Sequence, residues 1–351
     1  MAVFLAGGAG FIGSHMAVEL LERQYEVVVA DNYSNSTSEG LKRVEKLTGQ
    51  KVTFYECDVR DRAELDKIFS RHEINSIIHF AGFKAAGEST EKPIEYYSNN
   101  LMSTISLCQA MKRHDVRKLV FSSSACVYSD KNRMPITEDS IVGDCPNPYG
   151  RTKYFSEQIL RDGAMANPGW SVVLLRYFNL FGAHESGEIG DDPTGIPRNL
   201  PPFIAQTAAG RHSVLSIFGN DYPTPDGSCI RDYIHIMDLV KGHVAAIKYC
   251  DSHTGAEAFN LGTGKGTSNF ELVAAFEEAN GIKIPINITA RRPGDAPVSY
   301  CSTDKAKRLL GWSAEKTVED ACRDMWRWQS KNPNGYNHTK DGDKNDLSFR
   351  A

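Results

Sequence analysis

The sequence predicts an α/β protein built on a doubly wound parallel sheet, with a smaller second lobe toward the C-terminus. Three observations lead to this prediction. Short β-branched or apolar runs alternate with longer amphipathic stretches in the first half of the 351-residue chain, a glycine-rich turn follows the first run, and the alternation stops after Phe178. Alternating strands and helices are typical of a parallel sheet that is covered on both faces.

The first half of the chain supplies the strands of this sheet. Helices are expected over about residues 11 to 24 and about 93 to 114. The second of these carries apolar residues at three- and four-residue spacing, which indicates one apolar stripe. The stripe consists of Ile94, Tyr97, Leu101, Ile105 and Cys108. The expected strands are "AVFLAG", "EVVVAD", "VTFYECD", "SIIHFAG", "KLVFSSS" and "SVVLLRYF".

A Gly/Pro-rich stretch over residues 182 to 202 leads into a region of mixed short elements. Its strand-like pieces are "SVLSIFG", "YIHI", "AFNLG" and "KIPINIT", and helices are expected near 238 to 250, 268 to 280 and 317 to 330. We therefore expect one domain over 1–180 and a lobe over 181–340 that closes over a ligand held by the first domain. Segments of the chain can also cross from one of these parts to the other. The polar residues 341–351 are expected to form a loosely ordered tail.

Composition and charge exclude several classes of protein. The net charge is −4 and no dense Lys/Arg cluster is present, so nucleic acid is not an expected partner, although a small anionic substrate remains open. No apolar run is long enough to span a membrane. The eight cysteines are scattered without C-x-x-C spacing, and "MAVFLAGG" runs straight into a strand, so we expect reduced thiols in the cytoplasm. No residues have metal-site spacing, and His79 and His235 fit an apolar core.

The first expected strand ends in "GGAGFIGSH", which contains G-x-G-x-x-G at Gly8, Gly10 and Gly13 and a second glycine pattern at Gly7, Gly10 and Gly13. Such a turn lets a pyrophosphate approach the backbone at a helix N-terminus, as in Rossmann domains. Asp31 ends the next strand, where a carboxylate can bind both ribose hydroxyls but would repel a 2′-phosphate. We therefore expect NAD; the alternative is a structural turn without ligand.

Residues 147 to 153 read "NPYGRTK", which places Tyr149 four positions before Lys153 on one face of an expected helix. An isolated Y-x-x-x-K usually marks an ordinary helix. Beside a seated NAD⁺, the ammonium and the nicotinamide charge would together lower the pKa of the phenol, and about three units require about 4 kcal/mol. Ser124, at the carboxyl end of the strand "KLVFSSS", is placed to relay a proton.

These residues, together with "FAG" at 80 to 82, resemble the extended short-chain dehydrogenase/reductase family. Further motifs extend the resemblance over nearly the whole chain, to the UDP-galactose (UDP-glucose) 4-epimerase branch of that family. Departures from its pattern are Leu180, Arg198 and Ser299. The further motifs are "LRYFNLFGAHESG", "IPRNLPPFIAQ", "IFGNDYPTPDGSCIRDYIHIMDL", "NLGTGKGTSNFEL" and "RRPGDAPVSYCSTDKAKRLLGW".

The resemblance, added to the reading above, assigns roles residue by residue. Catalysis would fall to Tyr149, Lys153 and Ser124. The residues expected to bind NAD are Gly7, Gly10, Phe11, Ile12, Gly13, Asp31, Asn32, Asp58, Val59, Phe80, Ala81, Gly82, Lys84, Asn99, Ser122, Tyr149, Lys153 and Phe178. Those expected to bind a UDP-sugar are Ser124, Tyr149, Asn179, Asn199, Leu200, Leu215, Ser216, Phe218, Arg231, Arg292, Asp295 and Ser299.

The activity implied by the resemblance is reversible inversion at C4 of UDP-hexoses through a 4-keto sugar, by a homodimer that joins through the apolar stripe. Ser299 falls where some members have tyrosine, so we also expect UDP-N-acetylhexosamines to fit. One alternative is a sugar-nucleotide 4,6-dehydratase, although Ala125 and Cys126 follow Ser124 where such enzymes place an Asp-Glu pair. The other alternative is a non-catalytic NAD-sensing protein.

Overall fold

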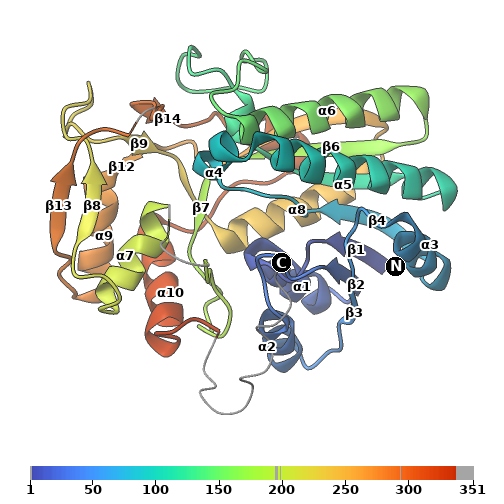
Figure 1. The fold of residues 1–351 in the computed structure, drawn as a ribbon, viewed down its shortest axis with the longest axis horizontal. Helices are drawn as coiled ribbons and strands as arrows, with labels where there is room; N and C mark the ends of the chain where they lie inside the picture. The colour runs from blue at the N-terminus through green and yellow to red at the C-terminus, as the bar shows by residue number, and fades with distance from the viewer. Residues whose placement is uncertain (1, 194–196, 198, 293, 337–351) are drawn as a thin grey trace.

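A central sheet of parallel strands forms the larger part of the molecule, as the sequence predicts (Figure 1). The computed structural model describes residues 2–193, 197, 199–292 and 294–336, so the tail expected over 341–351 lies outside the described residues. Within the described residues this sheet has seven strands, in the order β11 (Gly255–Leu261), β6 (Ser171–Tyr177), β5 (Lys118–Ser124), β4 (Ile74–His79), β1 (Ala2–Ala6), β2 (Glu26–Asp31) and β3 (Thr53–Glu56).

The strand order reverses at β1, which lies between β2 and β4. The chain leaves β1 for α1 (Phe11–Glu22) on one face of the sheet and later leaves β4 for α5 (Pro93–Arg113) on the other. The connections therefore diverge and open a crevice at the carboxyl ends of the two strands, which is where ligands bind to doubly wound sheets. The glycine turn after Ala6 and the segment after His79 form its walls, with Phe80 and Ala81 both donating to the Ala6 carbonyl at 2.8 Å.

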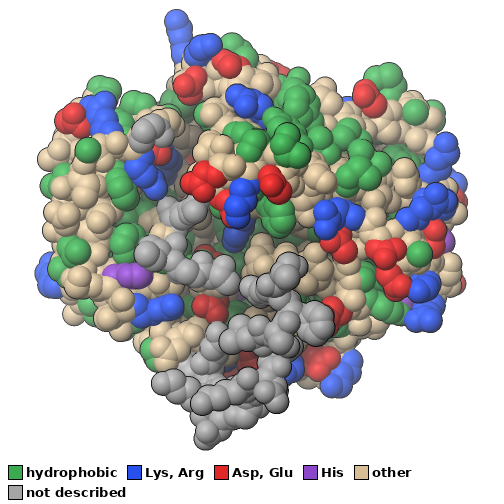
Figure 2. Space-filling model, viewed as in Figure 1, with side chains coloured by type: hydrophobic (Ala, Val, Ile, Leu, Met, Phe, Trp, Pro, Cys, Tyr) green, Lys and Arg blue, Asp and Glu red, His purple; other side chains and the backbone are tan. Residues whose placement is uncertain are grey.

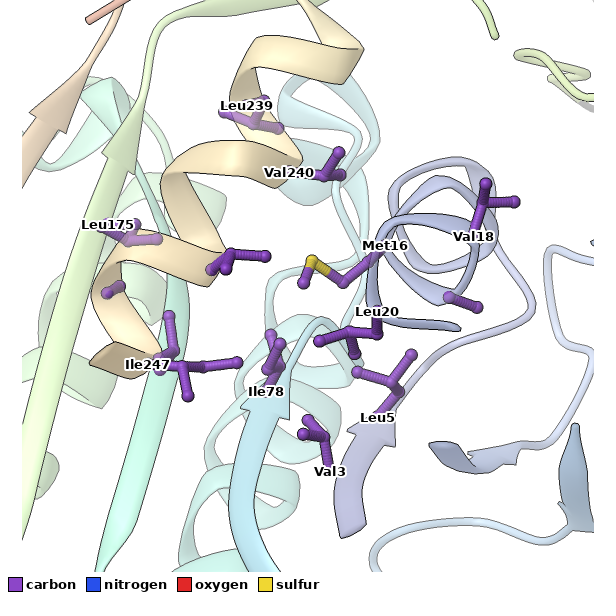
Figure 3. Packing of buried hydrophobic residues seen from close by; sticks show 14 of the residues in the cluster. Val3, Leu5, Met16, Val18, Leu20, Ile78, Leu175, Leu239, Val240 and Ile247 are labelled. Atoms are coloured by element: carbon purple, nitrogen blue, oxygen red, sulfur yellow. The ribbon is translucent and has the colours of Figure 1, made fainter. Parts of the chain in front are cut away.

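Helices cover both faces of the sheet (Figure 1). On one face, Met16 and Leu20 of α1 point toward Leu5 of β1 and toward Ile247 of α8 (Figure 3). These side chains are at most 3% exposed, and each buried Leu or Ile contributes about 1.5 to 3 kcal/mol. The helices on this face are α1, α2 (Ser38–Thr48) and α8 (Ile236–Cys250); α3 (Arg62–Arg71), α5 and α6 (Pro148–Ala166) cover the other.

The chain returns to the main sheet after it has left it, which corrects part of the predicted division. We expected "AFNLG" and the helix near 238 to 250 in the second lobe. Instead, β11 pairs in parallel with β6 along its whole length, and α8 packs on the sheet. Ala258 and Phe259 are buried on opposite faces of the sheet, so this strand is stabilised by contacts with segments distant in sequence. A five-residue apolar run carries no sign of which sheet it will join.

The smaller lobe lies beside the carboxyl ends of the strands (Figure 1). Its core includes Leu215, Phe276 and Met325. Two of its helices begin with reciprocal capping boxes, Ser268 with Glu271 and Thr317 with Asp320. Its elements are α7 (Leu200–Ala208), α9 (Asn269–Asn280), α10 (Val318–Lys331), β8 (Leu215–Phe218) with β13 (Ile286–Thr289), and β9 (Ile230–Arg231) with β12 (Thr267–Ser268) and β14 (Val298–Ser299). The short helix η2 (Ala306–Leu310) packs against the core of the main sheet instead.

A two-strand parallel ladder joins the two parts. In it, β7 (Asn179–Phe181), which follows the main-sheet strand β6, pairs with β10 (Tyr233–His235), which leads into α8. On the surface, acidic and basic side chains are interspersed over the face seen in Figure 2. Within the part of the chain that the structure describes, no helix is long and apolar enough to cross a membrane.

Candidate active site

The glycine turn between β1 and α1 has one position that protein packing alone does not explain. Gly7 has φ +78°, and a Cβ there would lie 2.7 Å from the Ala81 nitrogen; at Gly13 a Cβ would lie 2.5 Å from the Gly8 Cα. A Cβ on Gly10 would meet only the Gly7 carbonyl, at 4.0 Å. The helix that starts here has no side-chain cap and no acidic residue in its first turn. An open, uncapped helix N-terminus fits a diphosphate group.

Asp31 sits beside this turn, at the end of β2, and is buried. Its carboxylate accepts hydrogen bonds from the Ala9 nitrogen at 3.0 Å and from the Tyr33 nitrogen and the Ser36 hydroxyl at 2.9 Å. These bonds fix the two oxygens at the rim of the crevice. A carboxylate has about four lone-pair sites and three of them are used, so one site on Oδ2 remains for a ribose hydroxyl.

The end of β3 adds a second carboxylate on the same side. Asn32 donates to Asp58 at 3.1 Å, and Arg60 donates to the same carboxylate from two of its guanidinium nitrogens, Nε at 2.9 Å and Nη2 at 2.6 Å. The hydrogen bonds from Arg60 hold the pKa of Asp58 below its usual value. Val59 is buried, so it contributes a wall rather than a polar contact.

Asn100, which the sequence analysis missed, holds the segment after β4 against α6. Its oxygen accepts from the Phe83 nitrogen at 2.8 Å, and its amide donates to the Phe83 carbonyl at 3.0 Å and to Thr152 at 2.9 Å. Thr152 in turn donates to the Tyr149 carbonyl at 2.7 Å. We expected Asn99 here, which is half-buried and donates to Asn100 at 3.1 Å. The signal for Asn100 was its place on the buried helix face with Ser103 and Leu107.

Lys84 is exposed on the same segment, and its charge acts on the carboxyl of Asp191. Burial raises the pKa of Asp191, and the Lys84 ammonium acts against this shift. Lys84 therefore lies near the segment that leads toward α7.

Tyr149 and Lys153 both project from the start of α6 toward the end of β5. The Lys153 ammonium donates to the Ser122 carbonyl at 2.7 Å and lies 4.9 Å from the centroid of Phe121 and 6.0 Å from that of Tyr149. Ser124 lies beside the Tyr149 side chain, and the Ser124 hydroxyl oxygen accepts from the Cys126 nitrogen at 3.1 Å.

The local sequence explains why α6 begins here. Asn147 accepts from the Gly150 nitrogen at 2.9 Å, and Pro148 occupies the first helical position. A Cβ on Gly150 would lie 2.4 Å from the Cys126 carbonyl, so glycine lets the helix approach η1 (Ala125–Val127). This close approach brings Tyr149 to Ser124.

The chain's own groups alone do not favour a Tyr149 phenolate. Burial raises the pKa of Tyr149, and the neighbouring Ser124 side chain only partly opposes the shift. Burial also lowers the pKa of Lys153 to about 8, with the Glu157 carboxylate acting in the other direction. The chain's own groups therefore do not produce the predicted fall in the tyrosine pKa, because the buried site has a low dielectric. Any such fall has to come from further positive charge beside the phenol.

Across the crevice, the smaller lobe presents Arg231 on β9. Ser299 on β14 is its register partner, so the two side chains share one face of this short sheet. Burial raises the pKa of the Cys126 thiol, while a Ser124 hydrogen bond and the Arg231 charge oppose it. Arg231 is therefore close to Cys126, which lies next to Ser124, although Arg231 and Cys126 are far apart in the sequence.

A second cluster in this lobe joins three of the expected substrate residues. The Arg292 guanidinium carbon lies 4.7 Å from the centroid of Phe218, and its Nε donates to Asp295 at 3.1 Å. Ser216 is half-buried, as Phe218 is, on the same face of β8. We expected Leu215 to bind the UDP-sugar as well, but its side chain is fully buried in the lobe's core. Alternate residues of a strand point to opposite faces, so only the backbone of Leu215 could face a ligand.

The remaining expected residues lie on the segments between the two parts. Phe178 is 6% exposed and packs in a small core with Val127 and Cys301. Asn179 is exposed at the start of β7. Asn199 is exposed and precedes α7 without capping it by its side chain, and Leu200 packs against the lobe's core. Arg198 lies outside the described residues.

Among the described residues, no group of three or more His, Cys, Asp or Glu side chains is placed to hold a metal ion.

Comparisons with known proteins match this geometry. A family model described as "NAD dependent epimerase/dehydratase family" matches residues 3–262. The UDP-glucose 4-epimerase of Bacillus subtilis (strain 168) is 55% identical over 336 residues, which are 96% of this chain and 99% of that protein.

Two solved structures extend the comparison. A crystal structure of the UDP-glucose 4-epimerase from Bifidobacterium longum, in complex with NAD+ and UDP, has a TM-score of 0.92 at 51% identity and covers 95% of this chain and 100% of its own. The structure of the UDP-Glc/GlcNAc 4-epimerase from Campylobacter jejuni has a TM-score of 0.82 at 33% identity, with 94% of this chain and 99% of its own covered.

Proposed function

Since this chain belongs to the NAD dependent epimerase/dehydratase family, we propose that it interconverts UDP-glucose and UDP-galactose by reversible oxidation at C4. One observation carries the proposal. The Tyr149 side chain lies beside Ser124 at the carboxyl end of β5, with the Lys153 ammonium 6.0 Å from the centroid of its ring. A phenol with a hydroxyl relay and a fixed cation is suited to move the proton of a sugar hydroxyl.

The residues around the crevice fit NAD. The N-terminus of α1 and the open position at Gly10 would bind the diphosphate, Asp31 the adenosine ribose, and Asp58 and Val59 the adenine. When bound, NAD supplies a two-electron acceptor that is restored in every turnover, so the reaction has no net redox change. The other residues proposed for this role are Gly7, Phe11, Ile12, Gly13, Asn32, Phe80, Ala81, Gly82, Lys84, Asn99, Ser122, Tyr149, Lys153 and Phe178.

The chain's own groups then handle the proton. As a phenolate, which the added positive charge of bound NAD⁺ would favour, the Tyr149 oxygen would take the proton of the C4 hydroxyl, and Ser124 would bond the same hydroxyl or pass the proton on. Lys153 holds a positive charge beside the phenol from its fixed position on the Ser122 carbonyl. On return, the same groups deliver the proton to the oxygen of the 4-keto sugar, now presented by its opposite face.

The smaller lobe would hold the nucleotide while the sugar turns over. Guanidinium groups bind phosphate oxygens with two parallel hydrogen bonds, so Arg231 and Arg292 are assigned to the diphosphate. Ser216 and Phe218 would bind the uracil, and Asp295 the uridine ribose. Asn179, Asn199 and Leu200 would line the passage between nucleotide and sugar. We accordingly propose that the larger domain holds NAD and the smaller lobe holds the UDP-sugar.

A direct assay tests this function. Purified protein is mixed with UDP-galactose, without added NAD, and the UDP-glucose formed is measured by chromatography. We expect turnover, because the cofactor co-purifies and is regenerated. Tyr149→Phe is the control: it should lose about 10²- to 10⁴-fold in kcat while UDP binding survives. A protein without dinucleotide that NAD addition does not activate would contradict the proposal.

The same assay separates the alternatives. A 4,6-dehydratase would release a 4-keto-6-deoxy sugar, whereas an epimerase releases a hexose of unchanged mass. Ala125 and Cys126 form η1 directly after Ser124, so the carboxyl pair needed for water loss is not present at those positions. A non-catalytic NAD-sensing protein would bind NAD and convert neither substrate.

We further infer that N-acetylated UDP-hexosamines are substrates. Ser299 stands opposite Arg231, the residue proposed to bind the diphosphate, and a serine leaves room where a tyrosine would fill the pocket. The relative from Campylobacter jejuni is named a UDP-Glc/GlcNAc 4-epimerase, which supports the inference.

We also propose a homodimer joined through α5 and α6. In the apolar stripe predicted on α5, Ile94 is 73% exposed and the other four residues are only half-buried, so the chain does not bury this stripe itself. Met102 on α5 and Phe155 on α6 are also exposed, at 45% and 42%. Finally, all eight cysteines are free thiols, which supports the expected location in a reducing compartment, the cytoplasm.

A further inference from the structure

A buried ion pair lies behind the Tyr149 and Lys153 side chains. Glu157 on α6 and Arg176 on β6 have side chains that are 1% and 3% exposed. Arg176 donates to both carboxylate oxygens, at 3.0 and 2.7 Å, and Ser123 donates to one of them at 2.5 Å. Arg176 also donates to the Tyr128 hydroxyl at 3.0 Å. The Glu157 carboxylate is therefore held rigidly by groups from two strands.

This pair shares its supports with the candidate catalytic residues. Glu157 follows Lys153 by one helical turn, so both lie on the same face of α6. The three consecutive serines at the end of β5 each hold a different group of that helix. The Ser122 carbonyl accepts from Lys153, the Ser123 hydroxyl donates to Glu157, and Ser124 lies beside the Tyr149 side chain.

The groups around the Lys153 ammonium come from several elements. Burial lowers the pKa of His79 on β4 to about 3, with the Lys153 charge adding to this shift, and burial lowers the pKa of His243 on α8 to about 4. Burial raises the pKa of Tyr149 and of Tyr177 on β6, whose hydroxyl shares a hydrogen bond with Nε2 of His243. All four are therefore uncharged at neutral pH. Among the described residues, the charged groups of this buried cluster besides Lys153 are Glu157 and Arg176.

We propose that Glu157 is a positioning residue for the proposed epimerase: its carboxylate, anchored by Arg176 and Ser123, keeps the Lys153 side chain in the charged form beside Tyr149. An ammonium buried at this depth would otherwise lose its proton. Arg176 acts in the opposite sense, since its positive charge disfavours a second cation nearby. The inference rests on the proposed function for its catalytic consequence but not for the titration of Lys153 itself.

The two halves of the pair therefore have opposite effects. In Glu157→Gln the Arg176 charge is left alone, and the pKa of Lys153 should fall by about one unit. In Arg176→Met the Glu157 charge is left without its partner, and the pKa of Lys153 should rise by about the same amount. A purely structural pair would lower stability in both variants without moving the titration of Lys153 in opposite directions.

The titration of Lys153 is measured first without reference to activity. Protein is labelled with ¹³C at the lysine Cε, and the Lys153 resonance is assigned as the one lost in Lys153→Arg. We expect a midpoint near pH 8 in the unchanged protein, a lower one in Glu157→Gln and a higher one in Arg176→Met. The matched control is Asp324→Asn, which removes the partner of Arg327 in the smaller lobe and should leave the midpoint in place.

Epimerase activity is then followed against pH. The alkaline fall in kcat/KM should move in the same direction as the titration in each variant. If a single variant does not fold, the conservative variants decide: Glu157→Asp withdraws the carboxylate by one methylene and should lower the midpoint, whereas Arg176→Lys keeps the charge and should not. Midpoints that shift in one common direction, or not at all, overturn the inference. Absent epimerase activity with opposite shifts would contradict only the proposed function.

Discussion

Ser299 lies directly opposite Arg231 in the parallel pairing of β14 with β9. Residues 68 positions apart in the chain thus share one face of a short sheet, and Arg231 also acts on the Cys126 thiol next to Ser124. Ser299, one of the three departures from the family's pattern, therefore lies beside the arginine that is proposed to bind the diphosphate.

Replacing Ser299 tests the proposed substrate range. Ser299→Tyr should lose about 10- to 200-fold in kcat/KM on the N-acetylated pair, because a phenol ring occupies the acetamido space, and should keep most activity on UDP-galactose. Ser299→Ala is the control and should retain both activities. Equal losses on the two substrate pairs, or no activity of the unchanged protein on the N-acetylated pair, would rule the idea out.

The glycine turn offers a comparison of two alanine variants. Gly10 has extended backbone angles, φ −76° and ψ −177°, and its Cβ would meet open space, so Gly10→Ala should fold with less than about 1 kcal/mol of lost stability. It should still bind NAD at least about tenfold more weakly, since the Cβ occupies the diphosphate approach. Gly13→Ala should lose about 1 to 3 kcal/mol, because its Cβ collides with Gly8.

Urea unfolding measures the stability of each purified variant, and the NAD released by acid measures how much cofactor it has bound. The interpretation of Gly10 fails if its alanine variant keeps the full NAD content, or if the two variants lose stability equally.

The proposed dimer can be weakened at its surface. Ile94→Glu and Phe155→Glu add charge to exposed apolar positions on α5 and α6 and should raise the dimer dissociation constant by at least about tenfold. Ile141→Glu is the matched control, because Ile141 is 60% exposed but precedes α6 in a loop. Light scattering at micromolar concentration reports the mass, and a monomeric unchanged protein would exclude the dimer.

Buried histidines predict loss of stability in acid. Burial lowers the pKa of His15 and His79 to about 3 and that of His243 to about 4. Because these folded-state values lie below about 6.5, the unfolded chain binds more protons below that pH, so the stability is present above it and is lost as the pH falls toward 4. Each histidine lowers the free energy of unfolding by up to about 1.4 kcal/mol for each pH unit of acidification in this range.

Urea unfolding at about pH 7.5 and about pH 5.5 measures this loss. His15→Gln should make the decline shallower, because glutamine can keep the bond to the Phe11 carbonyl, which is 2.7 Å long in the protein, without binding a proton. If stability falls as steeply in this variant as in the unchanged protein, protonation of His15 does not contribute to the loss of stability in acid.

The sequence by itself determined the elements and the chemistry that depends on near neighbours. The alternation of strands and helices, the turn from Gly7 to Gly13 and the four-residue spacing of Tyr149 and Lys153 are all local patterns, and local backbone geometry converts each into a defined arrangement. The fold class follows from them, and the relationship to NAD-dependent epimerases follows from the resemblance of the longer motifs to that family; both are confirmed.

Tertiary structure alone decided whatever depends on contacts between distant segments. It joined β11 to the main sheet, turned the Leu215 side chain into the core, and brought Asn100 to Thr152 and Glu157 to Arg176. It also set the burial by which the chain's own groups raise the pKa of Tyr149; the fall expected beside bound NAD⁺ stays a prediction. The physical reason is common to all of these: burial and long-range pairing are set by how the whole chain packs, and no short stretch of sequence carries that information.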